Sequence, residues 1–131
     1  MATNTFYLTY AQLMEQYQFI ELHVEQLYAA ASDKGYLDGL QDVDKSSLPS
    51  TVNAICKLET EQNRTIFTED EYTALSHLIK RRNFWAHECF TKLSFKDSGT
   101  LKRPEDMHRM VADLRDAEEW REKLWNKQRQ Y

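Results

Sequence analysis

The sequence predicts an all-α protein, an up-and-down bundle of four or five helices. Its 131 residues include only three glycines and two prolines, far below the roughly 15 of average usage, which is too few for the tight turns of a β-sandwich or barrel. With 41% hydrophobic and 12% aromatic residues, the chain is too apolar to be disordered. Its length suits one domain over residues 1–131, with a core of its own.

The first helix is predicted over residues 5–31, where apolar side chains recur at steps of three and four. They share one face of a helix about 40 Å long. The members of this face are Phe6, Tyr10, Leu13, Tyr17, Ile20, Val24, Leu27, Tyr28 and Ala31. Residues 33–47 hold two of the three glycines and several aspartates, so they predict a loop with at most one short turn, and Gly35 is the expected helix stop.

The next two helices have recognisable starts. Ser46 or Ser47 can cap a helix with Pro49 in its first turn, whose buried side is expected to be Val52, Ile55, Leu58 and Ile66. Thr68 and Glu71 have the spacing of a capping box, which predicts a second helix running from residue 69 to about residue 93. Residues 94–100 are expected to break it.

The last helix is predicted from about residue 104 nearly to residue 131, with an apolar side of Met107, Met110, Val111, Leu114, Ala117 and Trp125. Its Trp120 and Trp125 stand among basic residues, a pattern that can stack bases and contact phosphates. The alternative, favoured by the interleaved glutamates, is one tryptophan in the core and a charged outer face.

Composition also bears on location and on partners. Every apolar run is too short to span a membrane, and the first five residues lack the pattern of a secretory signal. Cys56 and Cys89 are isolated thiols, which suits a reducing compartment. We therefore expect a cytoplasmic protein that does not associate with a membrane. The formal net charge of −4 argues against coating nucleic acid by charge alone, but it allows a local basic patch.

Arg82 breaks the apolar pattern of the helix predicted over residues 69–93. On a helical projection with Leu75 at 0°, Arg82 falls at roughly 340°, in the middle of the apolar stripe. A guanidinium there is costly unless it is paired or faces a cleft or a partner chain. A charged side chain at an apolar position of the helical pattern is typical of a functional site.

Asn83 and His87 lie beside Arg82 in the sequence. Asn83 and His87 are four residues apart, which makes their side chains neighbours on one flank of the stripe. Arg82 and His87 are five apart, about 140° around an α-helix, so one helix does not aim both at a single atom. A second copy of the helix, related by a two-fold axis, could place its own histidine near Arg82 of the first copy.

These three residue types suit cleavage of a phosphodiester without a metal. Histidine can accept or give a proton near neutral pH. Arginine can hold a phosphate by two parallel hydrogen bonds, and asparagine can orient the imidazole or donate to a phosphate oxygen. On RNA, a base would act on the 2′-hydroxyl, which attacks the adjacent phosphorus and leaves a 2′,3′-cyclic phosphate. The alternative without a catalytic function is a solvent-exposed basic turn followed by a half-buried histidine.

The segment from Arg82 to His87, R-N-F-W-A-H, resembles the signature of the HEPN superfamily: Arg, a polar residue, a short spacer and His, late in the penultimate helix of a small all-α chain. That resemblance implies a dimeric bundle in which two Arg and two His form one composite site. It also implies metal-independent endoribonuclease activity in toxin–antitoxin or antiviral systems. By the resemblance, Arg82 binds the scissile phosphate, His87 is the general acid/base and Asn83 supports them.

One family branch has a tyrosine two places after the histidine, where an antitoxin modifies it. Cys89 stands there in this chain, with Phe90 next, so regulation by that modification is in doubt, although an antitoxin or regulatory protein could act otherwise. Some family members are inactive and bind a nucleotide or a partner protein, which is the alternative function that we keep. A purely structural helical adaptor ranks below both, because it leaves Arg82 in the stripe without a reason.

Basic residues around the motif are the candidate substrate-binding residues: Lys80, Arg81, Lys92 and Lys96, with Lys102 and Arg103 following in the loop. His23 and His77 are expected to be exposed, and His108 to be surface or to line an RNA groove. No metal-ligand spacing or glycine-rich phosphate loop is present, so neither a metal nor another cofactor is expected. Cys89 is interpreted as a small core or interface residue.

Overall fold

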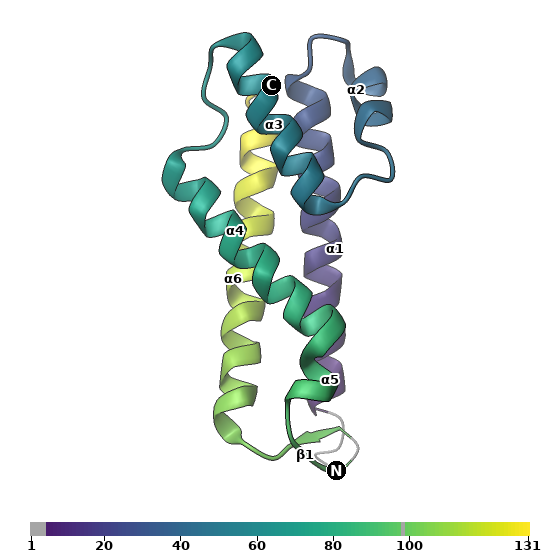
Figure 1. Cartoon of the computed structure of the whole chain (residues 1–131), viewed down its shortest axis with the longest axis vertical. Helices are drawn as coiled ribbons and strands as arrows, with labels where there is room; N and C mark the ends of the chain where they lie inside the picture. The colour runs from purple at the N-terminus through teal and green to yellow at the C-terminus, as the bar shows by residue number, and fades with distance from the viewer. Residues whose placement is uncertain (1–4, 98) are drawn as a thin grey trace.

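The computed structural model describes residues 5–97 and 99–131 of the chain, and these are almost entirely helical (Figure 1). The predicted all-α class is confirmed. The elements are α1 (Thr5–Ala31), α2 (Tyr36–Val43), α3 (Leu48–Gln62), α4 (Glu69–Asn83), the π-helical turn η1 (Phe84–Glu88), α5 (Cys89–Lys92), β1 (Phe95–Asp97), β2 (Thr100–Leu101) and α6 (Pro104–Gln128). Residues 1–4 and 98, which include most of the N-terminal segment and part of the predicted break, lie outside the described residues.

α1 and α6 are the two longest helices; they lie side by side and run in the same direction (Figure 1). Their contacts follow in parallel order: Gln16 accepts a hydrogen bond from Arg121, and the His23 ring lies against Trp125. α4 crosses this pair in the opposite direction, and α3 covers its upper part. The chain therefore rises in α1, α3 and α6 and descends in α4, with the short α2 on the descending stretch between α1 and α3.

The core is formed where α3 and α4 pack on the α1–α6 pair. Most of the predicted apolar face of α1 is buried, and the predicted buried side of α3 is confirmed, including Ile66 just beyond the end of the helix. The largest fully buried side chains are Trp85, Phe6, Phe67, Leu13, Ile20, Leu27, Ile55, Leu75, Leu78, Met110, Leu124 and Val24. Within the described residues, no helix combines the length and apolar character that crossing a membrane requires.

The loop prediction for residues 33–47 is wrong, because this stretch contains the two-turn helix α2. Gly39 explains why a glycine-bearing segment packs as a helix. A side chain at residue 39 would lie 2.8 Å from the Cα atom of Ala29, so only glycine lets α2 approach α1 this closely. Val43, 2% exposed, adds apolar burial at the end of α2. Tertiary packing has here outweighed the low helix propensity of glycine.

The predicted apolar side of α6 is wrong at its C-terminal end. Trp120 and Leu124 are buried, continuing the steps of three and four from Ala117, whereas Trp125 is 47% exposed. One tryptophan therefore belongs to the core and the other to the outer surface. The predicted break after residue 93 is confirmed, and it contains the small antiparallel hairpin of β1 and β2.

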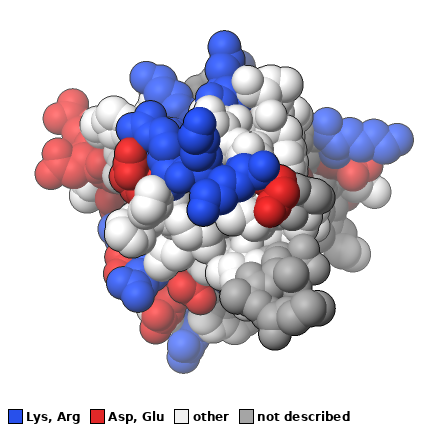
Figure 2. Space-filling model, turned by 90° about the horizontal axis from the view of Figure 1, so that it is seen from below, with Lys and Arg blue, Asp and Glu red and all other residues white. Residues whose placement is uncertain are grey.

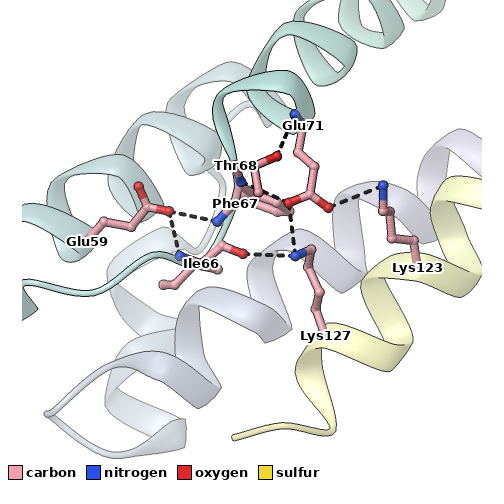
Figure 3. A network of polar contacts seen from close by, with 7 residues as sticks. All are labelled: Glu59, Ile66, Phe67, Thr68, Glu71, Lys123 and Lys127. Atoms are coloured by element: carbon pink, nitrogen blue, oxygen red, sulfur yellow. Dashed lines mark hydrogen bonds and ion pairs between the residues drawn. The ribbon is translucent and has the colours of Figure 1, made fainter.

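Both predicted helix starts are present. The Ser47 hydroxyl accepts a hydrogen bond from the backbone of Ser50, which caps α3. The Thr68 hydroxyl accepts from the backbone of Glu71 at 3.1 Å, and the Glu71 carboxylate accepts from the backbone of Thr68 at 2.9 Å, which completes the capping box of α4. Glu71 also pairs with Lys123 and Lys127 of α6 at 3.2 and 3.1 Å (Figure 3).

The segment between α3 and α4 is held by a second carboxylate in the same network (Figure 3). Glu59 accepts hydrogen bonds from the backbone N–H groups of Ile66 and Phe67, each at 2.8 Å. The Lys127 ammonium donates to the carbonyl of Ile66 at 2.9 Å. Three helices are thus tied together at one point, which fixes where α4 begins and hence how it crosses α1 and α6.

This network makes the stability of the fold depend on pH. Burial raises the pKa of Glu71, but the backbone hydrogen bond from Thr68 and the ammonium groups of Lys127 and Lys123 more than offset it, so the pKa lies below its usual value. A carboxyl with a lowered folded pKa stabilises the fold fully above its unfolded pKa, and that contribution is lost as the pH falls through the folded value.

We therefore expect Glu71→Gln to lose less stability than the unmodified chain when the pH is lowered from neutrality to about 3. Urea unfolding midpoints at a series of pH values measure this. Glu69→Gln, a change at an exposed residue of the same helical turn, is the matched control. Equal acid sensitivity of the Glu71→Gln variant and the unmodified chain would contradict the prediction.

Candidate functional site

The Arg82–His87 segment is not a regular α-helix. The helix predicted from residue 69 to about residue 93 changes at Phe84 into the π-helical turn η1, and α-helical geometry returns at Cys89. The backbone N–H of Cys89 donates to the carbonyl of Phe84, five residues earlier, instead of to that of Trp85. Such wide turns are rare and are frequent at functional sites. The uninterrupted α-helix is thus a prediction that the structure corrects.

The carbonyl of Trp85, which the wide turn deprives of its α-helical donor, has two side-chain partners instead. The Tyr10 hydroxyl of α1 donates to it at 3.0 Å, and the Cys89 thiol donates to it at 3.2 Å. Burial, together with the nearby Cys89, raises the pKa of Tyr10, so its hydroxyl stays protonated and remains a donor. The π-turn is therefore stabilised from outside its own helix.

The Trp85 side chain anchors the same turn in the core. It is completely buried, and its indole N–H donates to Asp113 of α6 at 2.7 Å. Arg109 of α6 lies over the Phe84 ring, 4.3 Å from its centroid, and covers the beginning of the turn. α1 and α6 thus both contribute contacts that fix the position of η1.

Replacing Tyr10 by phenylalanine removes one of the two donors to the Trp85 carbonyl. We expect the free energy of unfolding to fall by about 0.5–1.5 kcal/mol, the usual worth of a hydrogen bond in a folded protein. Urea unfolding followed by circular dichroism measures the change. Tyr28→Phe is the control, because the Tyr28 hydroxyl donates to Asp42 at 3.3 Å in an exposed place. A Tyr10→Phe variant no less stable than the control would contradict the prediction.

Arg82 faces α1, as its place in the apolar stripe predicts, and it has partners within the chain. Its guanidinium forms an ion pair with Glu21 of α1 and donates to the Asn83 side-chain oxygen at 2.9 Å. The Arg82 side chain is 24% exposed. A guanidinium has five N–H donors, so these two contacts orient it and leave other donors unused. The ion pair also accounts for Arg82 in the stripe without a second chain.

His87 is exposed and lies on the last part of η1. Among the hydrogen bonds, ion pairs and ring contacts of the described residues, none joins His87 to Arg82 or Asn83, so only two of the three predicted catalytic residues are directly linked. Each residue of a π-turn advances less around the axis than the 100° of an α-helix. The angular offset between Arg82 and His87 is therefore smaller than the roughly 140° that a regular helix imposes.

Arg81, predicted as a substrate-binding residue, is paired with acidic residues of α6. Its guanidinium pairs with Asp116 and lies 3.5 Å from Asp113, both on α6. Burial and the charge of Asp113 raise the pKa of the neighbouring Tyr17. These pairs give Arg81 a role in the packing of α4 against α6, and its role in substrate binding stays a prediction.

The other predicted substrate-binding residues are exposed. Lys80 lies near the end of α4, Lys92 ends α5 and Lys96 lies in β1. Lys102 and Arg103 follow β2 and are exposed as well. Seen from the end of the bundle that carries α5 and the hairpin, Lys and Arg side chains gather on one part of the surface (Figure 2).

The structure adds residues that sequence reasoning missed. Glu21, Tyr10 and Asp113 each contact the motif segment from another helix, and each lies 28 to 75 residues away along the chain. No spacing rule connects such distant positions. A signal that could have suggested Asp113 is its place near the apolar steps of α6, where an acidic residue needs a partner.

The cysteine at residue 89 and the other histidines show no arrangement that favours catalysis or metal binding among the described residues. Cys89 is 1% exposed, as a core residue should be, and burial raises the pKa of its thiol, which opposes a nucleophilic thiolate. His77 and His108 are exposed, whereas His23, also expected to be exposed, is half-buried beside Gln26, its hydrogen-bond partner at 3.1 Å. Within residues 5–97 and 99–131, no three His, Cys, Asp or Glu side chains gather in a way that could hold a metal ion.

Comparison with known proteins assigns no family. No protein-family model, curated protein or solved structure matches this chain. The resemblance to the HEPN signature therefore depends on the residues of the motif and on its place in the bundle.

Proposed function

We propose that this chain is a metal-independent endoribonuclease of the HEPN type that acts in the cytoplasm as a toxin or an antiviral defence effector. The observation that carries the proposal is the π-turn across the motif. It extends from Phe84 to Glu88, so it begins just after Arg82 and Asn83 and contains His87, and contacts from α1 and α6 hold it in place. A π-turn that needs hydrogen bonds from two other helices is expected where its unusual backbone geometry positions the side chains of a functional site.

Each motif residue has a role in the proposed reaction. His87, open to solvent, accepts the proton of the RNA 2′-hydroxyl, whose oxygen then attacks the adjacent phosphorus. Arg82 stabilises the charge that builds on the phosphate oxygens, using N–H donors that Glu21 and Asn83 leave unused. The 5′-oxygen leaves with a proton, and the products are a 2′,3′-cyclic phosphate and a 5′-hydroxyl.

The proposed working form is a homodimer. In-line cleavage needs one group to take a proton and another to give one, and each chain supplies a single motif histidine. Two copies related by a two-fold axis place two Arg82 and two His87 side chains around one phosphate. An antitoxin or regulatory protein that covers this interface would silence the enzyme.

The test is RNA cleavage in excess EDTA, with total tRNA and an mRNA as substrates. The proposal predicts cutting by the unmodified chain, ends that carry a cyclic phosphate, and loss of cutting in both Arg82→Ala and His87→Ala. Sedimentation velocity on the same samples reports the oligomeric state. Absence of cutting by a verified dimer at micromolar concentration, or cutting that survives both substitutions, would overturn the proposal.

The second candidate is an inactive bundle of the same type that binds a nucleotide or a partner protein. The observation that favours it is the ion pair between Arg82 and Glu21, which gives Arg82 a structural role. Under this candidate, Arg82→Ala alters stability, and the unmodified chain cuts no RNA.

A further inference from the structure

Five aromatic rings gather at the end of the bundle where α1 begins and α5 meets the hairpin; we call them the ring cluster. Its members are Phe6, Tyr7, Tyr10, Phe90 and Phe95. Phe6, only 1% exposed, lies at the centre, and each neighbouring ring centroid lies between 5.2 and 5.7 Å from its own. The buried centre makes the cluster a rigid base for its outer members.

Two members of the ring cluster face solvent. Phe90 is 52% exposed and Tyr7 is 40% exposed. Their rings are stacked, with centroids 6.5 Å apart and planes 29° from parallel, and Phe90 also stacks on Phe95 at 5.8 Å and 15°. A half-exposed phenylalanine held flat against other rings presents a ready surface for another planar group.

Exposed lysines lie close to the ring cluster along the chain, together with the exposed acids Glu88 and Asp97. Lys92 lies two residues after Phe90, Lys96 follows Phe95, and Lys102 comes directly after β2; all three are exposed. Figure 2 looks onto this end of the bundle and shows one group of Lys and Arg side chains with acidic side chains beside it, and other basic side chains around the rim. Arg103, in the same region, pairs with Glu105 at 2.7 Å, so the lysines supply most of the unneutralised charge.

We infer that the exposed face of Phe90 and Tyr7 binds single-stranded RNA, with an unpaired base stacked on the rings and the flanking phosphates against Lys92 and Lys96. Aromatic rings beside cations are the usual means of holding a single strand, because every base has a stacking face and every linkage a charge. A duplex offers no such face, since its bases already stack on one another.

The position of the ring cluster relates it to the proposed catalytic residue. Phe90 lies three residues after His87, about one helical turn further along the chain. A base held on Phe90 therefore brings a neighbouring phosphate into the region of His87. The role of this surface in holding a substrate rests on the proposed ribonuclease function. RNA binding by the surface can be measured without cleavage.

The experiment measures binding of a fluorescein-labelled 2′-O-methyl oligoribonucleotide of about 12 nucleotides by fluorescence anisotropy. This strand has no free 2′-hydroxyl and cannot be cut. Phe90→Leu keeps apolar volume in the cluster but removes the stacking face, and we expect affinity to fall roughly tenfold or more. Trp125→Leu is the matched control, because it removes an exposed aromatic side chain outside the cluster and is expected to leave affinity unchanged.

Two further measurements sharpen the test. Replacing Lys92 and Lys96 together by glutamine is expected to reduce the slope of log affinity against log salt by about 1.4, the value for two lost phosphate contacts. A duplex of the same length is expected to bind more weakly than the single strand. Equal binding of duplex and single strand, or undiminished binding by Phe90→Leu, would overturn the inference.

The outcomes separate this inference from the proposed function. Binding that depends on Phe90, in a chain that cuts no RNA, upholds the RNA surface and rejects the nuclease. Cutting that depends on His87, with binding indifferent to Phe90, upholds the nuclease and rejects the surface. Loss of a dimer in Phe90→Leu with RNA affinity unchanged would assign the rings to contact with a second copy of the chain, and so would also overturn the inference.

Discussion

Replacement of His87 by alanine is expected to reduce RNA cleavage by a factor of about 10² to 10⁴, the contribution of a positioned general acid or base. The fold should be unaffected, because His87 is exposed and no hydrogen bond, ion pair or ring contact among the described residues involves its side chain. Single-turnover cleavage of a labelled RNA in EDTA measures the rate, and circular dichroism with thermal melting verifies the fold. A loss of rate without a loss of stability identifies a residue of the reaction.

His77→Ala is the matched control for that experiment. His77 is another exposed histidine of the same long helical segment, two turns or more before the π-turn, and it has no part in the proposed site. Its substitution is expected to leave cleavage within about twofold of the unmodified chain, since a typical surface change is energetically small. If His77→Ala and His87→Ala slowed cleavage equally, His87 would have no special role.

Arg82 needs a more careful interpretation than His87, because it serves two purposes in the proposal. Arg82→Ala removes the phosphate ligand and also leaves Glu21 without its partner. Glu21→Gln keeps Arg82 and tests the ion pair alone. If Arg82 acted only through that pair, both substitutions would have similar effects on cleavage. A much larger loss in Arg82→Ala is the result that the nuclease proposal requires.

Local signals in the sequence were sufficient for most of the fold. The apolar periodicity of α1 and the capping box at Thr68 and Glu71 each depend on residues within a few positions of one another, so their geometry follows from the chain itself. α2 was missed for the opposite reason. Its Gly39 lowers helix propensity locally, and only contact with Ala29, ten residues earlier on another helix, shows why a glycine is needed there.

The candidate site, like the fold, could be predicted from the sequence only in part. Its residue types and the unusual place of Arg82 could be predicted, because both depend on sequence and helical period. The π-turn could not, since it is stabilised by the Tyr10 hydroxyl and by Asp113 on other helices. The ion pairs of Arg81 could not be predicted either, because its partners are two aspartates of α6, more than 30 residues later in the chain.

The largest loss of stability is expected from Asp113→Ala. Asp113 is 9% exposed and accepts the indole N–H of Trp85 at 2.7 Å, while Arg81 lies 3.5 Å away. Removing the carboxylate leaves a buried N–H without an acceptor and takes one of two anionic partners from Arg81. We expect the free energy of unfolding to fall by about 3 kcal/mol. Domains of this kind have about 5–15 kcal/mol in total, so the melting temperature should fall clearly.

Two companion variants separate the contributions of Asp113. Asp113→Asn keeps an oxygen that can accept from Trp85 but removes the charge, so it should be less damaging than Asp113→Ala. Asp116→Ala removes the more exposed partner of Arg81, and its cost should be smaller still because solvent screens that pair. Since Trp85 anchors the π-turn, Asp113→Ala should also slow RNA cleavage at temperatures where it remains folded. Unfolding free energies within about 0.5 kcal/mol of the unmodified chain would show that Asp113 does not hold the turn in place.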